Sequence, residues 1–172
     1  FMNICKGFGM EVLAYDPYPA NDPSIHYVDL HTLFQQSDIL SLHCPLTEQS
    51  KHLINKDTIA DMKDGVVLLN TSRGMLIESE ALLSALQSGK IAAAGLDVYE
   101  EETAFFFEDF SENIHRDQVL SLLLSMPNVL LTSYQAFLTN EALKNIAKVT
   151  LQNGTDFFDE KLLQNEVKTG QL

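Results

Sequence analysis

Short apolar runs alternate with amphipathic segments along most of the chain. Five apolar runs, each bounded by polar, glycine or proline residues, are predicted to be strands: 10–16, 38–44, 66–71, 92–98 and 128–133. The segments after them are predicted to be helices: 31–37, 55–62, 79–89, 119–125 and a long one over about 139–159. The strand runs are apolar throughout, as in a parallel sheet that helices cover on both faces. The pattern therefore predicts an α/β fold with a doubly wound parallel sheet.

The first eight residues carry a helical pattern of their own. Phe1, Ile4, Cys5 and Phe8 recur at helical spacing, and Gly9 ends the run. No Ser, Thr, Asp or Pro opens it, so the chain is expected to begin inside a helix.

Composition narrows the class of protein. A chain of 172 residues with 45% hydrophobic residues is the size of one ordinary globular domain, without a membrane-spanning run. A formal charge of -13 argues against nucleic acid and anionic membrane as partners, and it requires a locally positive pocket for any anionic ligand. Cys5 and Cys44 are too few for a disulfide framework, so a reducing, cytoplasmic setting is expected. The five histidines form no ligand pattern, and no metal site is predicted.

Candidate site residues follow the predicted strands, because ligands of open α/β sheets bind beyond the carboxyl ends of the strands. These positions are Asp16, Cys44 and Pro45, Thr71 to Gly74, Asp97 to Glu102, and Thr132 to Gln135.

Asp16 ends a strand that follows a helix. In a dinucleotide-binding unit this is the place of the carboxylate that accepts hydrogen bonds from the adenosine ribose. The alternative is that Asp16 simply opens an Asp-Pro turn. In the first case the glycine-rich loop of the unit would stand immediately before Phe1, and the chain would be truncated at its N-terminus.

Arg73 lies in the sequence NTSRG, directly after an apolar run. Its guanidinium could bind a carboxylate through two parallel hydrogen bonds, and Gly74 would let the backbone approach a ligand closely. Alternatively, Arg73 caps carbonyl groups or pairs with a surface acid. The three glutamates at 100 to 102 have their own simple interpretation, a solvated acidic loop.

Several of these segments together resemble one family. NTSRG, SEALLSALQSGKIAAAGLDVYEEE, FFFEDF and NVLLTSYQAFLTNEAL are similar to the NAD-dependent D-2-hydroxyacid dehydrogenases, most closely to their D-lactate dehydrogenase branch. The resemblance covers nearly the whole chain, and FFFEDF is the segment that favours the D-lactate branch.

The resemblance implies an organisation and a cofactor. Residues 1–140 would form part of a Rossmann-like NAD-binding domain without its first strand and glycine-rich loop. Residues 141–172 would form the long helix and a tail that returns towards a substrate domain, built mostly from a preceding part of the chain. NAD is the implied cofactor, a small 2-keto or 2-hydroxy acid the implied substrate, and a homodimer the implied assembly.

Roles for individual residues also come from the resemblance. Arg73 would bind the substrate carboxylate and polarise the keto group, and Glu102 would support the catalytic acid. The expected cofactor contacts are Asp16 at the ribose, Cys44 and Pro45 on the adenine and ribose side, and Thr71, Ser72 and Asp97 near the nicotinamide.

Tyr134 departs from the family pattern, which has histidine at this position of TSYQAF. An imidazole, with a pKa of about 6.5, exchanges its proton near neutrality, whereas a phenol, with a pKa of about 10, rarely releases one. A neighbouring carboxylate such as Glu102 would disfavour phenolate further. The predicted activity is reduction of pyruvate to D-lactate with a reduced or altered rate. The alternatives are an NAD-binding regulatory relative without turnover, or a truncated fragment without function.

Overall fold

The computed structural model describes residues 1–101, 117–135 and 137–167. It divides into two compact units, Phe1–Tyr134 and Gln135–Leu172. In the second unit, α7 (Asn140–Phe158) confirms the predicted long helix, and Thr139 caps it by accepting a hydrogen bond from the Ala142 amide. The predicted return of the tail towards a substrate domain stays a prediction.

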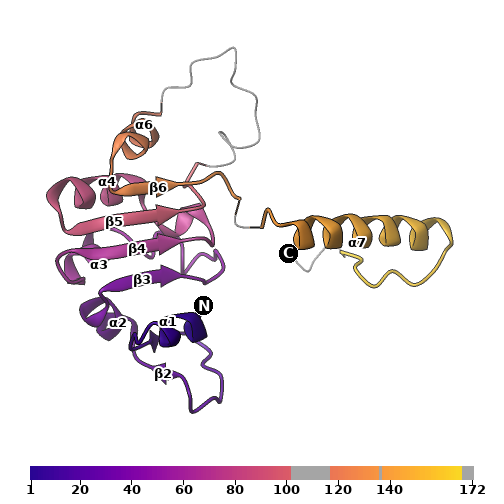
Figure 1. Cartoon of the computed structure of the whole chain (residues 1–172), viewed down its shortest axis with the longest axis horizontal. Helices are drawn as coiled ribbons and strands as arrows, with labels where there is room; N and C mark the ends of the chain where they lie inside the picture. The colour runs from indigo at the N-terminus through magenta and orange to yellow at the C-terminus, as the bar shows by residue number, and fades with distance from the viewer. Residues whose placement is uncertain (102–116, 136, 168–172) are drawn as a thin grey trace. The chain divides into compact units, whose positions relative to one another are not determined.

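A parallel sheet forms the centre of the first unit (Figure 1). Its four strands lie in the order β3-β4-β5-β6, with every neighbouring pair parallel. Their bounds are Ile39–Leu42, Val66–Asn70, Ile91–Leu96 and Val129–Leu131. Four predicted strands are thereby confirmed, with shorter bounds, and the parallel sheet with flanking helices confirms the Rossmann-like α/β class.

Two short strands form a separate sheet. β1 (Leu13–Ala14) pairs in parallel with β2 (His26–Tyr27). The strand predicted over 10–16 was therefore too long, because only two of its residues find a ladder partner, and β2 is too short to give a sequence pattern. Among the described strands β1 pairs only with β2, and β3 pairs only with β4.

The helices of the first unit begin and end at recognisable signals. Within the described residues they are α1 (Met2–Gly7), α2 (Leu30–Gln36), α3 (Lys56–Asp61), the 3-10 turn η1 (Gly74–Leu76), α4 (Ser79–Ser88) and α6 (Gln118–Ser125). Asp29, Asn55 and Asp117 cap α2, α3 and α6 by accepting backbone N–H bonds. Gly89, the last residue of the helix predicted over 79–89, ends α4 in the left-handed conformation, at φ 80°. α4 differs at its start, where Glu78 makes no side-chain cap.

The hydrophobic core lies between the sheet and these helices. Its most completely buried members include Leu68, Ile91, Leu82 and Leu123. The buried polar residues of the described part of the chain are Asn70, Ser79 and Asp97, and two of them stand at or just after strand ends. Within the described residues, no helix is long and apolar enough to cross a membrane, and no group of three metal-ligating side chains is assembled.

Candidate functional site

The carboxyl ends of three neighbouring strands are tied together by backbone hydrogen bonds that run past the strands themselves. The Asp97 amide donates to the Asn70 carbonyl at 2.9 Å, and the Tyr134 amide donates to the Asp97 carbonyl at 2.8 Å. The segments that follow β4, β5 and β6 therefore lie next to one another. Three of the predicted site segments meet at this edge of the sheet.

The turn after β4 is built around a buried amide. Asn70, at 0% exposure, donates from Nδ2 to the Arg73 carbonyl at 2.9 Å and accepts from the Ser72 amide at 3.0 Å. These two bonds fix the backbone of the turn while the Arg73 side chain remains exposed. Its Nη1 donates to the Ser72 carbonyl at 2.7 Å, and within the described residues it pairs with no carboxylate.

Ser72 connects this turn to the end of β3. Its hydroxyl donates to the Cys44 carbonyl at 2.6 Å. Partial burial raises the pKa of the Cys44 thiol, so this cysteine lines the site as an uncharged group and not as a thiolate. Pro45 follows Cys44 and Thr71 precedes Ser72 in the sequence, and both are exposed. Cys44, Ser72 and Arg73 are thus neighbours, as expected from their places after two adjacent strands.

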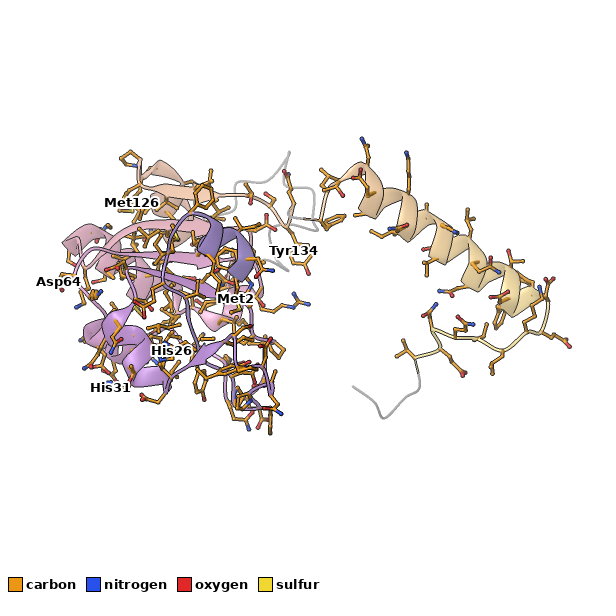
Figure 2. All side chains as sticks on the ribbon, turned by 60° about the horizontal axis from the view of Figure 1, so that its bottom comes forward. Met2, His26, His31, Asp64, Met126 and Tyr134 are labelled. Carbon is orange, nitrogen blue, oxygen red and sulfur yellow. The ribbon has the colours of Figure 1, made fainter. Side chains whose placement is uncertain are left out.

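Asp97 holds the segment that carries Tyr134. The aspartate is 7% exposed and accepts a hydrogen bond of 2.5 Å from the Thr132 hydroxyl. Tyr134 is half-buried and adopts a left-handed backbone at φ 52°, which is unusual for a residue with a large side chain. Figure 2 shows Tyr134, which follows β6, and Asp64, which precedes β4, at opposite sides of the unit, so Tyr134 lies at the carboxyl ends of the strands.

Asp16 stands apart from this group, beyond the end of β1 in the smaller sheet. It is exposed, and its Oδ1 accepts a hydrogen bond from the Tyr18 amide at 2.8 Å. This bond belongs to the Asp-Pro turn considered above. The same carboxylate has a second oxygen for a ligand, so its cofactor role stays a prediction. Glu102 and FFFEDF lie outside the described residues.

A second set of contacts at this edge has no signal in the sequence. Glu100 is half-buried: its Oε1 lies 2.6 Å from His52 Nε2, and its Oε2 accepts from the Ser79 amide at 2.9 Å. The interpretation of a solvated acidic loop is therefore wrong for Glu100. Burial alone would raise the pKa of its carboxyl, but hydrogen bonds from Ser79 and His52 outweigh that and hold the pKa below its ordinary value.

Gly74 permits a close approach of two backbone segments. A Cβ atom there would lie 1.8 Å from the carbonyl oxygen of Tyr99. The turn after β4 therefore packs directly on the backbone of the segment after β5. The predicted approach of a ligand to the Gly74 backbone stays a prediction.

Comparison with known proteins gives a consistent result. Residues 1–136 match the family model of the D-isomer specific 2-hydroxyacid dehydrogenase NAD-binding domain. The chain is 48% identical over 169 residues to the D-lactate dehydrogenase of Escherichia coli, covering 96% of this chain and 51% of that protein.

Solved structures of the same kind align closely. A D-lactate dehydrogenase of Treponema pallidum aligns with a TM-score of 0.87 at 41% identity, over 96% of this chain and 50% of that one. The enzyme of Lactobacillus jensenii, solved with NAD+, aligns with a TM-score of 0.86 at 32% identity and the same coverage. The chain spans about half the length of the curated relatives it matches. On its fold and on these matches, the chain belongs to the D-isomer specific 2-hydroxyacid dehydrogenase family, with the NAD-binding domain in residues 1–136.

Proposed function

We propose that this chain supplies the NAD-binding domain of an enzyme that reduces a small 2-keto acid to the D-2-hydroxy acid, with pyruvate and D-lactate as the pair. The observation that carries the proposal is Arg73, an exposed cation at the strand ends, beside the segments of Asp97 and Tyr134. In a chain of net charge -13, this guanidinium offers an anionic substrate the local positive charge that it needs. The name of the Escherichia coli relative supports the choice of pyruvate.

The polar groups at this edge fit a nicotinamide dinucleotide. Asp16 is an exposed carboxylate acceptor after β1, suited to the two hydroxyls of a ribose. Ser72 and Asp97 present polar groups after β4 and β5, where a nicotinamide amide could bond. The sequence contains no Gly-x-Gly-x-x-Gly turn, so the described residues suit the ribose and nicotinamide ends better than the pyrophosphate.

Each proposed catalytic residue has a distinct role. Arg73 binds the substrate carboxylate with its planar fork, and the same charge draws electron density towards the keto oxygen. NAD, when bound in its reduced form, supplies the hydride. Tyr134 donates the proton that the reduced keto oxygen takes up, and Glu102 adjusts the electrostatic field at that donor.

Tyr134 also supports a second candidate function. A phenol is a weaker acid than the imidazolium of the family pattern, and proton donation is worth on the order of 10²–10⁴-fold in rate. An NAD-binding relative that retains the pocket but turns over too slowly to serve as an enzyme would carry the same sequence. The rate of pyruvate reduction separates these two functions.

A fusion protein provides the test. The part of the Escherichia coli relative that this chain does not match is placed before Phe1, in line with the family resemblance, and pyruvate-dependent NADH oxidation is measured. The relative's own two parts, joined at the same junction, serve as the positive control. We expect turnover that Arg73→Lys reduces on the order of 10²-fold or more, since lysine cannot form the bidentate contact. Undetectable pyruvate reduction in a folded fusion protein that binds NADH would favour the second candidate.

A further inference from the structure

His52 and Glu100 join three loops at the carboxyl edge of the sheet. His52 lies between β3 and α3, Glu100 follows β5, and the Ser79 amide that Glu100 accepts from begins α4 after the β4 turn. The two oxygens of one carboxylate therefore bind groups from both of the other loops.

The loop after β3 and the turn after β4 are already joined to each other by backbone hydrogen bonds. The His52 amide donates to the Met75 carbonyl at 2.8 Å, the Ile54 amide to the Leu76 carbonyl at 3.0 Å, and the Glu78 amide to the Ile54 carbonyl at 2.9 Å. His52 itself is held in a left-handed conformation, at φ 51°. Its side chain is thus presented to Glu100 from a fixed position.

The third loop, which follows β5, meets this pair at Gly74 and at Glu100. Gly74 packs on the Tyr99 carbonyl, and Glu100 is the next residue. Glu100 also stabilises the start of α4, which has no side-chain cap of its own, because a carboxylate accepts a free N–H there and faces the positive end of the helix dipole. The carboxylate therefore acts on the β4 turn and on its own loop together.

We propose that His52 and Glu100 form a positioning pair that holds the Arg73 turn and the loop after β5 in a fixed mutual arrangement. Glu100 lies two residues before Glu102, and Gly74 follows Arg73 directly. In this proposal the pair acts through the backbone of the two segments and not on the substrate itself. It sets where the substrate-binding arginine stands relative to the segment that leads to Glu102, and this role rests on the proposed function.

The first test uses the chain itself and needs no activity. In Glu100→Gln, amide hydrogen exchange at Ser79 and across Gly74–Leu76 should accelerate on the order of tenfold, the size of effect expected when a helix cap is lost. His52→Leu should act in the same direction, and His52→Gln, which keeps an N–H donor, should restore most of the protection. The matched control is His31→Leu, which removes an exposed histidine 3.3 Å from Asp61 in another part of the unit and should leave these amides unchanged. Unchanged exchange across Gly74–Leu76 in both Glu100→Gln and His52→Leu would overturn the proposal.

The second test separates positioning from simple structural support. In the fusion protein, His52→Leu and Glu100→Gln should each lower kcat/KM for pyruvate on the order of tenfold without changing the dissociation constant of NADH, and His52→Gln should recover most of the loss. If exchange accelerates but kcat/KM stays within about twofold of the parent, the pair is only a helix cap and the proposal is wrong. A parent fusion protein without pyruvate reduction would count against the proposed function, whereas unchanged amide exchange in both variants would count against the pair.

Discussion

Gly74→Ala tests the contact on which the geometry of the site depends. A Cβ at this position would lie 1.8 Å from the Tyr99 carbonyl oxygen, 2.1 Å from its carbon and 2.7 Å from the Glu100 nitrogen. Contacts below 3.0 Å do not occur for real Cβ atoms, so the two segments must separate by about 1.2 Å. All three obstacles are backbone atoms, which no rotamer change can move. The cost should reach or exceed the upper part of the range of about 1–3 kcal/mol that is typical of overpacking.

Urea unfolding followed through the near-ultraviolet circular dichroism of tyrosine measures this cost, because Tyr99 is 5% exposed and next to the contact. In thermal unfolding, the same loss corresponds to a fall of roughly 4–12 °C for a protein of this size. Two other glycines provide a graded control. Gly7→Ala meets nothing within 4 Å and should change stability little, whereas Gly95→Ala meets only the mobile end of Leu69 at 2.9 Å and should be intermediate. If Gly74→Ala is as stable as Gly7→Ala, the inference that Gly74 packs directly on the Tyr99 backbone is wrong.

Three further predictions concern the site. In the fusion protein, Tyr134→His should raise pyruvate reduction on the order of 10²–10⁴-fold with unchanged NADH affinity, and adding Glu102→Gln should cancel much of the gain; a change within about twofold would remove Tyr134 from the proton-donor role. Asp16 should make NADH preferred over NADPH, because its carboxylate would repel a 2′-phosphate, and equal kcat/KM for the two would contradict that assignment. The pKa of Glu100 is lowered in the folded chain, so its contribution to stability is present above the unfolded-state pKa and is lost as the pH falls through the folded-state pKa. Urea unfolding should therefore show Glu100→Gln as less stable than the parent at pH 7 and equal to it in strong acid; a difference independent of pH would refute this.

The sequence predicted those features that depend on neighbours along the chain. The apolar runs predicted four parallel strands, and Gly89 marked the end of α4. Arg73 and Asp97 were found because a polar residue after an apolar run stands at the edge where open sheets bind ligands. Asn70 was missed, although an amide that ends the run VVLLN carried a usable signal.

Contacts between segments that are far apart in the sequence were not predicted. His52 and Glu100 are 48 residues apart, and Gly74 meets Tyr99 across two loops. Neither contact repeats with a helical or strand period, so no local pattern encodes it. Glu100 looked like one of three equivalent acids, and only the unfilled N-terminus of α4 distinguishes it from its neighbours.

Isotope transfer tests whether a hydride passes from NADH to pyruvate on this NAD-binding domain. The fusion protein is incubated with pyruvate and NADH deuterated at the transferring position, and the lactate is resolved by chirality and analysed by mass spectrometry. We expect D-lactate with one deuterium at C2, formed in amounts that Arg73→Lys strongly reduces. L-lactate, unlabelled lactate, or no lactate from a folded protein that binds NADH would contradict this expectation.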